Sequence, residues 1–82
     1  MEVTDLAPQI AFHPEICGGQ PHIKGKRFAI WLILEWLEEG KSFEDILEAF
    51  EVLTREDISA AINYAKLKIK GTEIKRVEVS PR

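Results

Sequence analysis

Ala29-Ile30-Trp31-Leu32-Ile33-Leu34-Glu35-Trp36-Leu37-Glu38-Glu39-Gly40 is a run that predicts one helix of about three turns. Its main apolar face has the i, i+3, i+4, i+7 spacing and consists of Ile30, Ile33, Leu34 and Leu37. Trp31, Leu32 and Trp36 are apolar too, although they lie off that face. A helix that is apolar nearly all round is normally buried nearly all round. We therefore expect Trp31, Leu32 and Trp36 to contact a second copy of the chain or another protein, unless short flanking elements cover them.

The composition narrows the class of protein. Eighty-two residues are enough for a single domain over 1–82, with a modest core that dimerisation would help to stabilise. The net charge of -3 argues against a generally basic nucleic-acid binder. The one cysteine, Cys17, cannot form an intramolecular disulfide and is typical of a reducing compartment. The acidic N-terminus lacks a signal-like apolar run, and the apolar run 28–34 is too short to cross a bilayer. We expect a soluble, cytoplasmic protein without membrane contact.

The segment before the first helix predicts a β-hairpin over about 10–28, following an irregular lead over residues 1–9. Its arms are the short runs 22–24 and 27–29, and the intervening Gly25-Lys26 suits a type II′ turn because glycine comes first. Ile10-Ala11-Phe12 is a further short strand candidate, which Pro14 ends.

Three helices are predicted over about 29–70. Gly40 ends the first helix, Ser42 caps the second with Asp45 three residues on, and Thr54 caps the third. The third helix runs from Arg55 to about Lys68, and Gly71 stops it. Its predicted inward face comprises Ile58, Ala61, Ile62, Ala65 and Ile69. Two short capped helices joined by about four residues are typical of a helix-turn-helix pair. The predicted class is mostly α, with an N-terminal β-hairpin, a trihelical helix-turn-helix core and a C-terminal tail over 71–82.

The run Pro14-Glu15-Ile16-Cys17-Gly18-Gly19-Gln20-Pro21-His22-Ile23-Lys24-Gly25-Lys26-Arg27 resembles the Pro-x-Ile-x-Gly-Gly-x-Pro-x-Ile-x-Gly-Thr-Arg signature of the DUF433 family. Residues 31–35 and 53–65 match the first and last helices of that family, so the resemblance covers about 10–66. Lys26 departs from it, because the family usually has Thr there. The resemblance implies a homeodomain-like trihelical fold. It also implies the role of a VapB-like antitoxin, encoded beside a PIN-like nuclease toxin.

DNA binding is one function that the residues allow. The outward stripe of the third helix carries side chains that reach phosphates or base edges, namely Arg55, Ser59, Asn63 and Lys66. Glu56 and Asp57 lie at the end of the helix that usually meets DNA, and acids there repel phosphate. The alternative is that this stripe is simply the solvated face of a capped helix.

Inhibition of a nuclease toxin would use other residues. A PIN-like nuclease holds its metals with carboxylates, which an arginine can neutralise. The candidates are Arg27, within the basic cluster 24–27, and Arg76 and Arg82 of the tail. Val77 and Val79 alternate with charged residues and suit strand addition to a partner's sheet edge. The alternatives are ordinary surface charge, and pairing of the tail with the chain's own hairpin.

Metal binding and catalysis are the remaining readings. His13, Cys17 and His22 are metal-ligand types within ten positions, but their spacing matches no zinc pattern and a fourth ligand is missing. Cys17 also lacks a nearby Asp or Asn to orient a base. We therefore expect no metal, no cofactor and no enzymatic activity.

The favoured function is a dimeric antitoxin that inhibits a PIN-like toxin and binds its own operator DNA. The alternative is a stand-alone helix-turn-helix transcriptional regulator, and a small hydrolase is a distant third.

Overall fold

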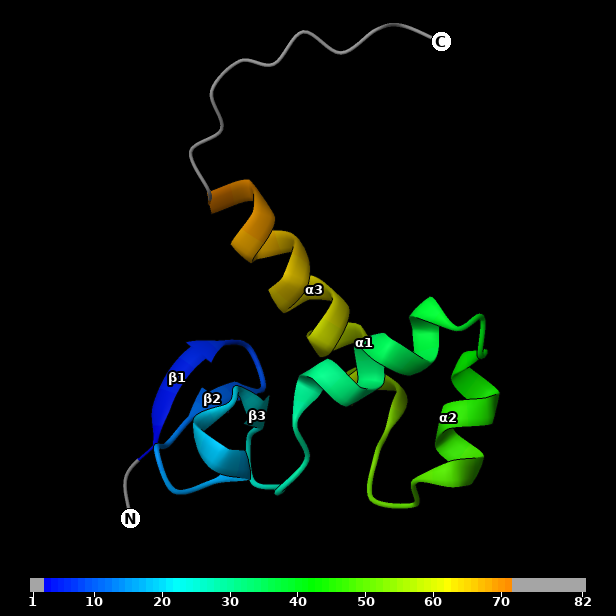
Figure 1. Cartoon of the computed structure of the whole chain (residues 1–82), viewed down its shortest axis with the longest axis horizontal. Helices are drawn as coiled ribbons and strands as arrows, with labels where there is room; N and C mark the ends of the chain where they lie inside the picture. Colours follow the sequence, from blue (N-terminus) through cyan, green and yellow to red (C-terminus); the bar gives the residue numbers. More distant parts are fainter. Residues whose placement is uncertain (1–2, 72–82) are drawn as a thin grey trace, which may run out of the picture.

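A computed structural model describes residues 3–71 of the chain. Three strands precede three helices along the sequence (Figure 1): β1 (Thr4–Ala7), β2 (Ile10–Phe12), β3 (His22–Ile23), α1 (Ile30–Glu38), α2 (Phe43–Ala49) and α3 (Arg55–Gly71). A single 3-10 turn, Cys17–Gly19, lies between β2 and β3. The predicted class, mostly α with an N-terminal β-hairpin, is confirmed. The predicted tail lies outside the described residues from 72 onward.

The strands form one antiparallel sheet in the order β1-β2-β3. Thr4 pairs with Phe12 and Asp5 with Ala11, so the hairpin begins six residues earlier than the predicted start at residue 10. The expectation of an irregular lead over 1–9 is therefore wrong for residues 4–7. The β1 side chains are mostly exposed, whereas Ile10 and Ala11 of β2 are fully buried. Backbone pairing with β2 therefore holds β1 in place. Its sequence lacks the alternation of apolar and polar residues that would have predicted a strand.

The predicted pairing of 22–24 with 27–29 is reduced to one bridge, between His22 and Ala29. The Lys26 N–H donates to the Ile23 carbonyl at 2.9 Å, so the four-residue turn runs from Ile23 to Lys26. Gly25, with φ of 83°, is the third residue of this turn. A positive φ at that position is the requirement of a type II turn. The predicted type II′ turn, which needs glycine one position earlier, is wrong.

The predicted end of the first helix and the predicted starts of the second and third are confirmed, whereas α3 continues to Gly71, past its predicted end near Lys68. Gly40 follows α1 with φ of 91°, in the left-handed region that favours glycine. Ser42 and Asp45 form a reciprocal capping box, with N···O distances of 2.9 and 3.0 Å. The backbone hydrogen bond from Ser42 lowers the pKa of the Asp45 carboxyl. Thr54 and Asp57 make the same reciprocal pair at the start of α3, at 3.0 and 3.2 Å.

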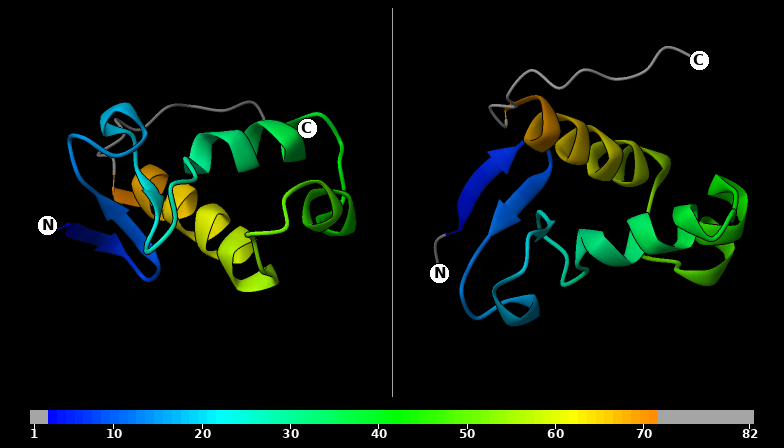
Figure 2. Two further views of the ribbon diagram at one scale, coloured as in Figure 1. Left: turned by 90° about the horizontal axis from the view of Figure 1, so that it is seen from below. Right: turned by 45° about the horizontal axis from the view of Figure 1, so that its top comes forward.

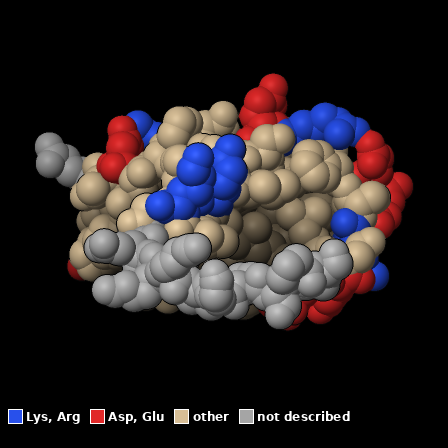
Figure 3. All heavy atoms as spheres, turned by 90° about the horizontal axis from the view of Figure 1, so that it is seen from above, with Lys and Arg blue, Asp and Glu red and all other residues tan. Residues whose placement is uncertain are grey.

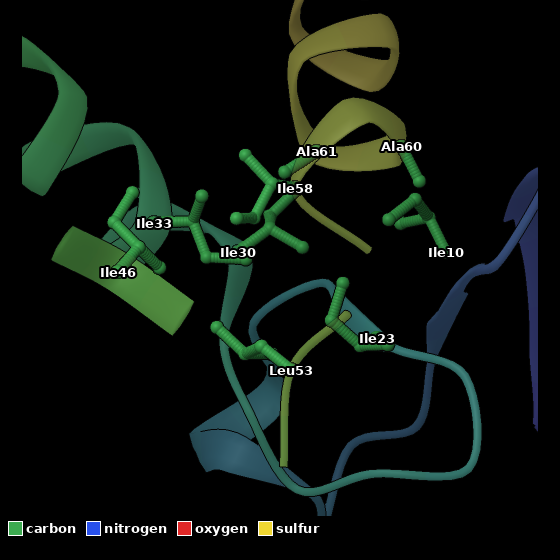
Figure 4. Close-up of a cluster of buried hydrophobic side chains, with 9 residues drawn as sticks. All are labelled: Ile10, Ile23, Ile30, Ile33, Ile46, Leu53, Ile58, Ala60 and Ala61. Carbon is green, nitrogen blue, oxygen red and sulfur yellow. The ribbon is translucent and has the colours of Figure 1, made fainter. Parts of the chain in front are cut away.

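The core lies where the sheet, α1 and the first half of α3 meet (Figure 4). Its buried side chains come from nearly every element: Ile10, Ile23, Ile30, Ile33, Ile46, Leu53, Ile58, Ala60 and Ala61. An aromatic group packs against this core, in which Phe50 makes edge contacts with Phe28 and with Trp36 at centroid distances of 4.9 and 5.0 Å. These contacts tie the end of α2 to α1 and to the segment before it.

The second half of α3 runs on past α1, toward the end of β1 (Figure 2). All four buried residues of α3, Asp57, Ile58, Ala60 and Ala61, lie in its first two turns. Ile62 is 41% exposed and Ile69 is 64% exposed. Their predicted place on the inward face is therefore wrong, because the helix extends beyond the elements that cover it.

Candidate functional site

The outward stripe of α3 forms one wall of an open groove of about 460 Å³. Arg55, Ser59 and Asn63 line this groove, together with Pro8 and Gln9 of the β1–β2 turn. The structure thus brings together three of the four predicted DNA-binding residues. The fourth, Lys66, is exposed on the next turn of α3 but does not line the groove. No local pattern indicates that the β1–β2 turn forms the opposite wall.

Two acidic residues reduce the positive charge at this groove. Arg55 pairs with Glu44 of α2, and its guanidinium lies 5.8 Å from the centroid of the Phe43 ring. The hydrogen bond from Arg55 lowers the pKa of the Glu44 carboxyl. Glu56 also lines the groove. Any phosphate that binds Arg55 must compete with Glu44, so the groove is less suited to tight nucleic-acid binding than its residue types alone suggest.

A buried carboxylate lies directly behind the groove. The Asp57 side chain is 3% exposed and accepts a hydrogen bond from Gln9 Nε2 at 2.8 Å and one from the Thr54 N–H at 3.0 Å. It also forms an ion pair with Lys26. Asp57 therefore fixes the β1–β2 turn and the turn after β3 against the start of α3. The sequence reading placed Asp57 in the first turn of a capped helix but missed both of these tertiary contacts.

The basic cluster 24–27 is partly neutralised within the chain. Lys24 pairs with Asp5 at 2.9 Å and Lys26 pairs with Asp57. Arg27 is exposed and has no ion-pair partner within residues 3–71. Of the predicted partner-binding residues, Arg27 is thus a cation that a partner's acid can reach. Arg76, Val77, Val79 and Arg82 lie outside the described residues.

The three predicted dimer-interface residues differ in their surroundings. Trp31 is 51% exposed at the start of α1, whereas Leu32 is half-buried. Trp36 is also half-buried, and its ring packs edge-on against Phe50. The chain itself therefore covers part of Trp36, as the monomer alternative expects, and leaves about half of Trp31 open.

Further exposed apolar residues occur on the second half of α3. Ile62 and Ile69 are seven residues apart, so they lie on the same side of the helix, and Leu67 is 44% exposed on another side. Figure 3 shows the face on which α3 ends, where uncharged side chains spread beside a group of Lys and Arg side chains. Contiguous exposed apolar patches mark surfaces that bind other proteins, whereas single exposed apolar side chains occur on most protein surfaces.

The candidate metal ligands have other roles or surroundings. His13 Nδ1 accepts a hydrogen bond from the Glu15 N–H at 3.0 Å, Cys17 is half-buried in the 3-10 turn, and His22 is buried. Within residues 3–71, no three side chains of metal-ligand type lie close enough together to hold an ion. The same described part of the chain contains no helix that is long and apolar enough to cross a membrane.

Comparisons with known proteins agree on one family. A family model described as "Protein of unknown function (DUF433)" matches residues 10–65. The crystal structure of a DUF433 member protein from Anabaena variabilis ATCC 29413 superposes with a TM-score of 0.68 at 31% sequence identity. That match covers 76% of this chain and 61% of the other, so this chain spans less than two thirds of that protein's length. No curated protein matches the chain.

Proposed function

The chain belongs to the DUF433 family, and we propose that it acts as an antitoxin-type protein that binds and inhibits a PIN-like nuclease encoded beside it. In this proposal it works in the cytoplasm as a homodimer and has no catalytic residue, metal or cofactor of its own. Its surface for the nuclease comprises the exposed apolar residues of α3 and Arg27, which has no ion-pair partner within residues 3–71.

The observation that carries this proposal is the apolar exposure of α3 beyond the core. Ile62 and Ile69 are 41% and 64% exposed on one side of a helix whose buried residues all lie nearer its start. Leaving large aliphatic side chains in water forgoes about 1 to 3 kcal/mol of burial for each of them. A protein partner would recover that free energy. The pairing of Arg55 with Glu44 supports the same choice, because it weakens the competing reading of a surface made chiefly for DNA.

A binding and inhibition assay with the product of the neighbouring nuclease gene tests the proposal. The full chain should form a complex that survives gel filtration and should suppress the nuclease. A double variant, Ile62→Ser with Ile69→Ser, should weaken the complex by tenfold or more, on the order of 1.5 kcal/mol or above. The matched control is Val52→Ser, because Val52 is 57% exposed but lies between α2 and α3. Equal binding by the double variant and the control would contradict the proposed surface.

The second candidate is a stand-alone helix-turn-helix regulator, which the groove between α3 and the β1–β2 turn favours. Arg55, Ser59 and Asn63 form one row there, as in a helix that reads DNA. Sequence-selective binding to the chain's own upstream DNA, with no partner protein present, would favour this candidate over the first. Measurable turnover that is lost in Cys17→Ala or His13→Ala would instead contradict the non-enzymatic part of the proposal.

A further inference from the structure

A cavity of about 400 Å³ lies beside the turn that joins β3 to α1. Four of the side chains that line it can donate hydrogen bonds or carry positive charge: His22, Lys24, Lys26 and Arg27. Among the described residues of its lining there is no Asp or Glu. A cavity lined by cations and donors, with no carboxylate facing it, has the chemistry of an anion site.

The His22 ring supplies an independent indication. This side chain is 1% exposed, yet its Nδ1 atom has no hydrogen-bond partner within the described chain. Buried polar atoms are nearly always hydrogen-bonded, and an exception calls for an explanation. The ring lines the cavity, but Nδ1 itself is closed to solvent, so a small shift of the ring or of a neighbouring side chain would let an oxygen atom bound in the cavity supply the missing partner.

The two lysines are held in place at the cavity by carboxylates that do not line it. Lys24 pairs with Asp5 at 2.9 Å, and Lys26 pairs with the buried Asp57. Two of the three positive charges of the lining are thereby balanced, and the charge of Arg27 is left over. Because the fold already restricts these two lysine side chains, a ligand that contacts them causes a smaller loss of conformational entropy on binding.

The backbone of the turn adds further donors. Its own hydrogen bonds use the N–H groups of Ile23, Lys24 and Lys26. The N–H groups of Gly25 and Arg27 take no part in them. Unused backbone N–H groups beside a glycine with positive φ, such as those on either side of Lys26, are a common means of binding anions.

We propose that this cavity binds the phosphate group of a small phosphate monoester, such as a mononucleotide. The three terminal oxygens of a monoester can accept hydrogen bonds from several directions, whereas a carboxylate offers two oxygens in one plane. The cavity is larger than a bare ion requires, and Val3 and Ile16 give it an apolar wall for the organic part of the ligand. This site is additional to the proposed function and does not depend on it.

Nuclear magnetic resonance titration of the isotopically labelled full chain tests the site. Inorganic phosphate and AMP, added at matched ionic strength, should give saturable shifts of the Gly25 and Arg27 amide signals and of the His22 ring signals. AMP should bind more tightly than inorganic phosphate, while adenosine and acetate should leave these signals in place. An equal response to acetate, or AMP binding no tighter than phosphate, would overturn the assignment.

A pair of charge-matched variants locates the binding. Arg27→Gln should raise the dissociation constant for AMP about tenfold, because it removes a charge-assisted hydrogen bond. Lys70→Gln also removes one exposed cation, but from the far end of α3, and should leave the constant unchanged. Thermal unfolding of both variants checks that each keeps its fold. Equal effects of the two substitutions would show that AMP binds through general surface charge, and that result would overturn the site.

Discussion

The ammonium group of Lys26 and the carboxylate of Asp57 form an ion pair across 31 positions of sequence. The Lys26 side chain is 30% exposed, whereas that of Asp57 is 3% exposed. The Asp57 carboxylate therefore lies inside the fold, and the Lys26 side chain reaches it from the surface. This pair joins the turn after β3 to the start of α3, and the hydrogen bond from Gln9 to the same carboxylate sets how the β1–β2 turn faces the outward stripe of that helix.

Asp57→Ala should lower the free energy of unfolding by on the order of 3 kcal/mol. The substitution removes a buried carboxylate that accepts hydrogen bonds from Gln9 and the Thr54 N–H and pairs with Lys26, and breaking such a buried pair costs about 3 kcal/mol. Urea unfolding followed by circular dichroism measures the change. Asp5→Ala is the control, because the Asp5–Lys24 pair is exposed and should contribute less than about 1 kcal/mol. Similar losses in the two variants would show that Asp57 does not anchor the fold.

The pH dependence of stability should reveal the cap of α2. The hydrogen bond from the Ser42 backbone holds the pKa of Asp45 below its ordinary value of 3.8. A depressed pKa in the folded state adds stability above the unfolded value, and that stability is lost as pH falls through the folded pKa. In Asp45→Asn, the loss of stability between about pH 5 and pH 2 should therefore be shallower than in the parent chain. Thermal unfolding across this range measures it, and parallel curves would contradict the assignment.

Local patterns predicted the parts of this fold that depend on neighbouring residues. The helix starts at Ser42 and Thr54 and the end at Gly40 follow from capping chemistry that acts within four residues. The outward stripe of α3 followed from helical periodicity, and it placed Arg55, Ser59 and Asn63 on one groove.

The features that sequence reasoning missed depend on distant partners. Gln9 and Lys26 reach Asp57 from 48 and 31 positions away, and no local pattern announces such contacts. The exposure of Ile62 and Ile69 was missed for a related reason. Periodicity shows which side of a helix is apolar, but it does not show how far along the helix the covering elements extend.

Trp31 and Trp36 should respond differently to truncation. We expect the chain to be a homodimer, and Trp31→Ala should weaken it by on the order of 2 kcal/mol with little change in monomer stability, because Trp31 is 51% exposed. Trp36→Ala should instead lower the free energy of unfolding by about 2 kcal/mol or more, because its ring packs on Phe50. Sedimentation equilibrium and urea unfolding separate the two effects. A parent chain that is monomeric at tens of micromolar, roughly the range in which a specific dimer persists, would contradict the dimer.

Glu44→Gln should strengthen nucleic-acid binding if the groove beside α3 is the binding surface. Glu44 pairs with Arg55, so removing its charge frees one cation for a phosphate. Affinity for the chain's upstream DNA should rise, and the slope of log affinity against log salt should steepen by about one.

Two further variants divide the surface by role. Asn63→Ala should relax sequence preference, whereas Lys66→Ala should weaken all DNA sites about equally.

Glu48→Gln is the matched control for Glu44→Gln, because it removes an exposed α2 carboxylate that lines a different hollow. If Glu44→Gln and Glu48→Gln change binding alike, the gain reflects net charge, and the groove is not where DNA binds.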